Sequence, residues 1–96
     1  MKRRKLIFTA KAEADLTTIG DFIARDDPRA ALKWVRKLVA TAHAAARVPF
    51  AGRRVPELQQ EEVREVFLKR YRIVYRVKAN SVEVLTVFEG HKQLAL

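Results

Sequence analysis

Residues 70–77, RYRIVYRV, place charged side chains at a spacing that could support chemistry. Polar and apolar residues alternate along this stretch, which predicts a β-strand with Arg72 and Arg76 on one face. Two such arginines could hold the phosphate of an RNA substrate, bind the carboxylates of an acidic partner, or form an ordinary solvated strand face. An imidazole, the side chain best suited to proton transfer near neutral pH, follows at His91. A catalytic, a binding and a purely structural interpretation therefore all remain open at this point.

Composition limits the other kinds of chemistry. The 96 residues are enough for one small domain, 1–96, and 49% of them are hydrophobic, which predicts a real core. The chain has no cysteine, two histidines and no H-E-x-x-H motif, so we expect no disulfide, no metal site and no cofactor. No apolar run approaches the roughly 20 residues that span a bilayer. These features favour a cytoplasmic protein with no membrane partner.

The charge balance indicates a polyanionic partner. There are 20 Lys and Arg residues against 11 Asp and Glu residues, which gives a formal net charge of +9. Between Pro28 and Pro56 the chain has no acidic residue and seven basic ones: Arg29, Lys33, Arg36, Lys37, Arg47, Arg53 and Arg54. Such a cluster favours an acidic protein segment or nucleic acid as partner, although basic residues also keep small domains soluble.

The N-terminal half is predicted to form one strand and two helices. Residues 6–8 are a short strand, and Thr9 then caps a helix whose apolar residues recur at helical spacing. Asp27 caps a second helix, with Pro28 at its first position. Because the link between the two helices is short, we expect them to form an antiparallel hairpin.

The C-terminal half is predicted to form strands. Residues 49–58, PFAGRRVPEL, are expected to be an irregular loop. Strands over 63–68, 71–77 and 82–88 follow with short links, so they must pair antiparallel. The predicted order is β-α-α-β-β-β, an α+β domain with the N-terminal helical hairpin packed on one face of a small, mainly antiparallel sheet.

A two-residue turn at 69–70 would fix the register between strands 63–68 and 71–77. On an apolar face, expected to lie under the helices, it pairs Leu68 with Tyr71, Val66 with Ile73 and Arg64 with Tyr75. On the other face it pairs Phe67 with Arg72, Glu65 with Val74 and Val63 with Arg76. We expect this second face to be open and to bind a partner, and a slip of one residue would exchange the two faces.

Several pieces of the sequence, in their order and spacing, resemble a known family. They are FTAKAEADL and IGDFIARDDPRAA in the helical half, PFAGRRVPEL in the loop, VREVFLKRYRIVYRV in the hairpin and VLTVFEGH at the last strand. Together they cover nearly the whole chain, which resembles the RelE/ParE superfamily of type II toxin–antitoxin toxins, and the ParE branch most closely. The resemblance implies a growth-inhibiting protein held silent by an antitoxin whose C-terminal segment wraps the toxin.

The superfamily has two activities, and the site residues must decide between them. RelE-type members cut mRNA on the ribosome, a reaction that needs a base, an acid and cations for the phosphate. Characterised ParE-type members instead poison DNA gyrase. Arg72 matches the motif arginine of the nucleases, and His91 and Lys92 lie near where the nucleases carry catalytic cations or imidazoles. The basic pair that the nucleases have on the preceding strand falls at Val63 and Glu65, and a carboxylate would repel the phosphate.

The resemblance and the residues together favour a ParE-like toxin that acts by binding gyrase, not by catalysis. The alternative is a RelE-like, ribosome-dependent mRNA endonuclease that uses Arg72, His91 and Lys92. The residues predicted to bind the antitoxin or the target are Arg72, Arg76, Phe67, Val74, Trp34 and Arg36. Trp34 is either such an anchor or an edge residue of the core, and Arg64 is predicted to have a structural role, bonding loop carbonyls or a helix end.

The expected partners follow from the same resemblance. They are a ParD-like antitoxin with an acidic C-terminal segment, which would form a hetero-oligomer with the toxin, and DNA gyrase as the target. Direct binding of nucleic acid by the basic chain is a weaker alternative, which predicts an affinity that falls steeply with salt.

Overall fold

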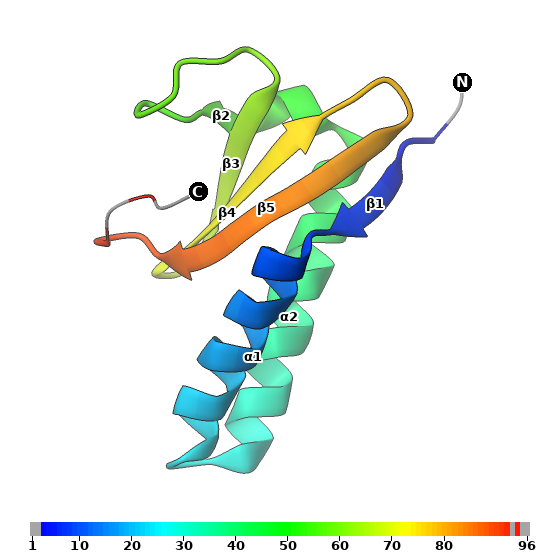
Figure 1. Ribbon diagram of the computed structural model, residues 1–96. Helices are drawn as coiled ribbons and strands as arrows, with labels where there is room; N and C mark the ends of the chain where they lie inside the picture. Colours follow the sequence, from blue (N-terminus) through cyan, green and yellow to red (C-terminus); the bar gives the residue numbers. More distant parts are fainter. Residues whose placement is uncertain (1–2, 93, 95–96) are drawn as a thin grey trace.

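A computed structural model of the chain describes residues 3–92 and 94. The elements follow in the order β1 (Lys5–Phe8), α1 (Ala10–Ala24), α2 (Pro28–Arg47), the 3-10 turn η1 (Pro49–Ala51), β2 (Arg53–Arg54), β3 (Val63–Leu68), β4 (Tyr71–Val77) and β5 (Ser81–Glu89). Helices α1 and α2 form a hairpin on one face of the sheet, and the tip of the hairpin extends beyond the sheet (Figure 1). The predicted α+β fold class is confirmed. No helix within the described residues is long and apolar enough to cross a membrane.

The sheet has the strand order β1-β5-β4-β3-β2. β1 lies parallel to β5, and the other neighbours are antiparallel. The predicted register between β3 and β4 is confirmed at all six pairs, from Val63 opposite Arg76 to Leu68 opposite Tyr71. The expectation of an irregular loop over 49–58 is wrong in part, because this segment contains η1 and the short edge strand β2.

The side chains of Thr9 and Asp15 fasten α1 to β5. As predicted, Thr9 caps α1: its hydroxyl oxygen accepts from the Ala12 N–H at 3.1 Å and donates to the Val84 carbonyl of β5 at 2.8 Å. Two turns later Asp15 accepts from the Val87 N–H at 3.1 Å. Asp27 caps α2 in the same way, by accepting from two backbone N–H groups of its first turn.

The protein has hydrophobic cores on both faces of the sheet. The larger one lies under the helices and includes Leu38 of α2 and Ile73 of β4, both buried. On the opposite face Val55, Val63 and Val74 form a smaller core, against which Leu58 and Phe88 pack. The expectation that this second face is open at Arg72 and Val74 is therefore wrong, because the segment that follows β2 folds back over it and buries both side chains.

The loop before β3 is held by polar contacts with β3 and β4. The Tyr75 hydroxyl is buried and donates to the Pro49 carbonyl at 2.6 Å, and burial raises the pKa of this phenol. Gly52 passes so close to that hydroxyl that a β-carbon at this position would collide with it. Arg64 Nη1 donates to the carbonyls of Phe50 at 2.9 Å and Gly52 at 3.0 Å. These contacts fix β2 beside β3 and so place the site described next.

Candidate functional site

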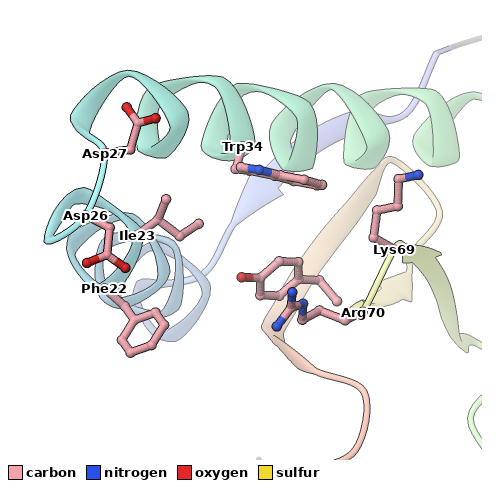
Figure 2. A pocket seen from close by; sticks show the side chains of 8 residues that line it. Phe22, Ile23, Asp26, Asp27, Trp34, Lys69 and Arg70 are labelled. Atoms are coloured by element: carbon pink, nitrogen blue, oxygen red, sulfur yellow. The ribbon is translucent and has the colours of Figure 1, made fainter.

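A hollow of about 370 Å³ separates the tip of the helical hairpin from the turn between β3 and β4. Its apolar lining consists of Phe22, Ile23, Trp34 and Tyr71. As Figure 2 shows, Asp26 and Asp27 stand on the hairpin side, whereas Lys69 and Arg70 stand on the turn side. The hollow thus has an apolar floor between an acidic rim and a basic rim.

Two aromatic rings form much of that floor. The ring centres of Trp34 and Tyr71 lie 6.4 Å apart, and the ring planes are tilted by 56°. This tilted arrangement is one that pairs of aromatic rings prefer. Burial, and secondarily the charge of Glu89, raises the pKa of the Tyr71 phenol, so the hydroxyl is neutral at physiological pH. Phe22 is 65% exposed at the edge. The arrangement suits an apolar side chain of a partner.

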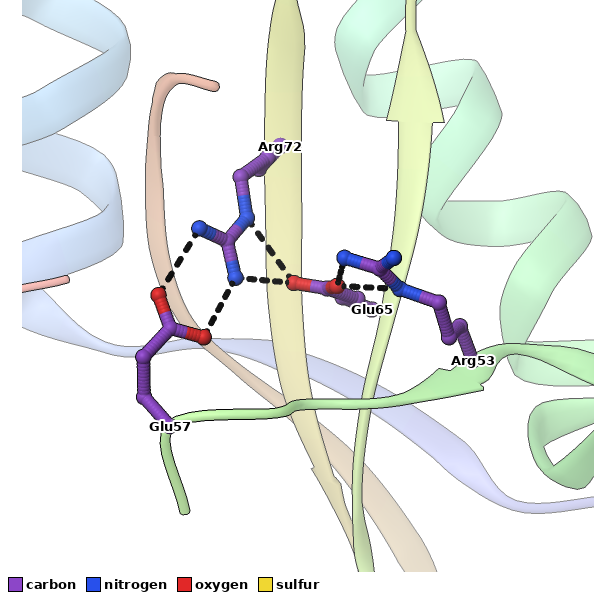
Figure 3. A network of polar contacts seen from close by, with 4 residues as sticks. All are labelled: Arg53, Glu57, Glu65 and Arg72. Atoms are coloured by element: carbon purple, nitrogen blue, oxygen red, sulfur yellow. Dashed lines mark hydrogen bonds and ion pairs between the residues drawn. The ribbon is translucent and has the colours of Figure 1, made fainter. Parts of the chain in front are cut away.

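A second group of residues, which we call the arginine cluster, lies on the sheet face away from the helices. It consists of Arg53, Glu57, Glu65 and Arg72 (Figure 3). The Glu65 carboxylate accepts from Arg72 Nε at 2.9 Å through one oxygen and from Arg53 Nε at 2.8 Å through the other. Arg72 also donates from Nη1 and Nη2 to the two oxygens of Glu57, at 3.0 and 3.1 Å. The buried carboxylate of Glu65 therefore joins the guanidinium groups of Arg53 and Arg72, and the carboxylate of Glu57 binds the outer side of Arg72.

Strand pairing brings the cluster together. β2 sets Arg53 directly opposite Glu65, and β4 sets Arg72 one diagonal step away on the same face of the sheet. The guanidinium of Arg72 also lies 5.0 Å from the centre of the Phe88 ring and 5.9 Å from that of Phe67, within range for cation–π attraction.

Arg72 has little capacity left for a substrate. Glu57 and Glu65 together accept four hydrogen bonds from it, out of the five N–H donors that a guanidinium has. Its side chain is 7% exposed, and that of Glu65 is 0% exposed. The hydrogen bond to Glu57 raises the pKa of Arg72, and the same contact lowers the pKa of Glu57. Two cations and two anions balance, so the cluster offers no net positive charge to a phosphate.

The other two residues of the predicted nuclease site pair with Glu89 and not with Arg72. His91 and Lys92 follow β5, and both are exposed. His91 Nδ1 and Lys92 Nζ each lie 3.8 Å from a carboxylate oxygen of Glu89. No hydrogen bond or ion pair within the described residues joins either of them to Arg72. Residues 3–92 and 94 also contain no group of three acidic or histidine side chains that could hold a metal.

The predicted binding residues are distributed over different surfaces. Phe67 is 49% exposed beside the arginine cluster, and the side chain of Arg76 is 36% exposed with Glu62 at 3.6 Å. Trp34 is half-buried in the hollow, and Arg36 is exposed on α2. Val74 is fully buried. The structure thus brings Phe67 and Arg72 together but leaves Trp34 and Arg36 on other surfaces.

The partners of Arg72 were not predicted from the sequence. Glu65 was expected to repel a substrate phosphate, and its pairing with the arginines was not foreseen. The predicted register contained a sign of this pairing, because it places Glu65 on the same face of adjacent strands as Arg72 and Arg76. Arg53 and Glu57 gave no comparable signal, since both lie in the segment predicted to be an irregular loop.

Comparisons with known proteins agree with this fold. A family model described as "ParE toxin of type II toxin-antitoxin system, parDE" matches residues 6–94. The chain is 33% identical to a protein of Sinorhizobium fredii named "Putative toxin Y4kP", over 97% of this chain and 95% of that protein. A solved chain from the chromosomal ParDE toxin–antitoxin system of P. aeruginosa superposes with a TM-score of 0.76 at 28% identity, covering 91% of this chain and 96% of that one.

These matches establish a toxin of a type II toxin–antitoxin system. The chain belongs to the ParE toxin family, and the resemblance described from its sequence is confirmed.

The two glutamates of the arginine cluster should differ in their effect on stability. Glu65→Gln removes the charge between two arginines, and we expect it to lower the free energy of unfolding by about 3 kcal/mol, as for a broken buried pair. Glu57 has a side chain 42% exposed, so Glu57→Gln should cost less than about 1 kcal/mol at neutral pH. Urea unfolding of both variants measures the difference, and equal costs would contradict it.

The effect of Glu57→Gln should also depend on pH. The fold lowers the pKa of Glu57, so its contribution is present above the pKa of the unfolded chain and is lost as pH falls through the folded value. The stability gap between the wild type and this variant should therefore close in acid.

Proposed function

We propose that this ParE-family toxin inhibits growth by binding and poisoning DNA gyrase, and that a ParD-like antitoxin neutralises it. The observation that carries the proposal is the state of Arg72. This arginine is the one that matches the nuclease motif, yet it already forms ion pairs with Glu57 and Glu65 of the same chain. A cation already neutralised in this way adds little to the stabilisation of a developing phosphate charge. Membership of the ParE family supports the same choice of mechanism.

The antitoxin is proposed to insert an apolar side chain into the hollow at Trp34. The hollow is open, has an aromatic floor, and has charged side chains of both signs at its rim. Aromatic anchors in such pockets dominate the energy of many interfaces. The basic surface of the chain, with a formal net charge of +9, suits an acidic antitoxin segment and would speed its association. The similar solved chain from P. aeruginosa comes from a ParDE system, which supports a partner of the ParD type.

The gyrase proposal is tested by supercoiling of relaxed plasmid with increasing amounts of the purified chain. We expect supercoiling to fall and gyrase-dependent cleaved plasmid to accumulate in the same reactions. A control without gyrase should show no cleaved plasmid, because the chain itself is proposed to have no nuclease activity. Loss of supercoiling without cleaved plasmid would indicate only that the chain coats DNA.

A different outcome would overturn the gyrase proposal. If a folded sample that arrests growth has no effect on gyrase at large excess, the target lies elsewhere. Ribosome-bound mRNA would then be assayed with His91→Ala, since that imidazole is the exposed candidate for proton transfer.

The antitoxin proposal is tested by Trp34→Ala. We expect this change to weaken the complex with the antitoxin by about 2 kcal/mol or more, because it removes half of the aromatic floor of the hollow. The matched control is Val48→Ala, which shortens an apolar side chain that is 62% exposed just beyond the other end of α2. Calorimetric titration of both variants measures the difference. If Trp34→Ala binds as tightly as the control, the antitoxin does not use the hollow.

A further inference from the structure

The outward face of α2 has a row of basic side chains, which we call the basic row. It consists of Arg29, Lys33, Arg36, His43 and Arg47. Counted from Arg29, they lie at i, i+4, i+7, i+14 and i+18, so at 3.6 residues per turn they fall within an arc of about 80°. Ala40 occupies the same arc between Arg36 and His43. α2 contains no acidic residue at any position.

The basic row is exposed and has no intramolecular counter-charge. All five side chains are exposed, and within residues 3–92 and 94 no ion pair of up to 4.0 Å includes any of them. The arginines of the sheet differ in this respect, because Arg53, Arg64, Arg72 and Arg76 each pair with a glutamate. α2 therefore presents a run of positive charge that the described residues do not neutralise.

A second segment extends the basic row at the C-terminal end of α2. Arg3 and Arg4, which precede β1, line a hollow of about 210 Å³ together with His43 and Arg47. Arg4 is oriented there by a hydrogen bond from its Nε to the Lys78 carbonyl at 2.8 Å. Positive charge thus continues past the end of the helix, and residues far apart in the sequence supply it.

Length and composition decide which polyanion fits this face. α2 has 20 residues and so measures about 30 Å, close to the length of one turn of B-form DNA. The large apolar side chain exposed beside the basic row is Leu32, in the N-terminal part of α2, which is 54% exposed. The cores of protein interfaces are instead rich in aromatic and apolar residues and poor in charge. A straight row of one sign is the electrostatic footprint of a nucleic-acid backbone.

We propose that the basic row binds the phosphate backbone of duplex DNA, without sequence specificity. This binding is a property of the chain alone and goes beyond the proposed action on gyrase. Such binding would concentrate the toxin on DNA, where the proposed target, gyrase, acts. The contacts are charge contacts to phosphate oxygens, which release condensed counterions and therefore weaken as salt rises.

The test compares two variants with the same loss of charge. Arg29→Gln, Lys33→Gln and Arg36→Gln together neutralise three members of the basic row. The control combines Lys11→Gln, Arg54→Gln and Lys78→Gln, whose side chains are 46%, 55% and 52% exposed and each of which pairs with a carboxylate. Fluorescence anisotropy with a short labelled duplex measures binding between about 50 and 200 mM salt. Thermal melting confirms that all three proteins are folded.

We expect the wild type to bind the duplex and the basic-row variant to bind about tenfold more weakly or worse at low salt. The slope of log affinity against log salt should fall by about 2.7, since each phosphate contact contributes about 0.9. The control should stay close to the wild type. Equal losses in both variants would show that only the overall charge matters, and undetectable binding by the wild type at low salt would also overturn the proposal. If the basic-row variant keeps its affinity for DNA but loses the antitoxin, the face belongs to an acidic protein, and the proposal is again wrong.

Discussion

The buried carboxylate of Glu65 is the interaction on which the rest of this structure depends. It lies on β3 and accepts from Arg72 of β4 and Arg53 of β2, so that one side chain connects three strands. Through Arg72 the network reaches Glu57, in the segment that covers the sheet. An unpaired carboxylate at this depth would carry a large desolvation cost. The position of β2 and the covering of the sheet are therefore coupled to the formation of this cluster.

Charge is distributed unevenly over the molecule. On the sheet side, arginines pair with glutamates of the same chain, and little positive charge remains for a ligand. On the helical side the cations of α2 have no such partners within the described residues. A ParE-family toxin with this arrangement would meet macromolecules through the hairpin and the hollow at its tip. Arg72, the motif arginine, is instead paired with two glutamates of the same chain. This pairing is consistent with the proposed action by binding.

The sequence was sufficient to predict the local features of the fold. The helix caps at Thr9 and Asp27 and the register of the β3–β4 hairpin are set by neighbouring residues, and all of these were predicted correctly. The strand β2 was missed because it is two residues long and exists only by pairing with β3. The burial of Arg72 and Val74 was missed because the covering segment approaches from a different part of the chain. The hollow likewise joins the tip of the hairpin to a turn more than thirty residues away.

The central claim is that Arg72 compensates the buried charge of Glu65 and does not act on a target. The most direct measurement is growth arrest by the double variant Arg72→Met, Glu65→Met, with thermal melting of the same protein. Apolar residues of similar size can replace a buried ion pair at little cost, and Arg53 and Glu57 are exposed enough to be solvated alone, with side chains 58% and 42% exposed. We predict a folded protein that still arrests growth when its expression is induced. A folded variant that no longer arrests growth would contradict the account, because Arg72 would then be needed for more than the structure.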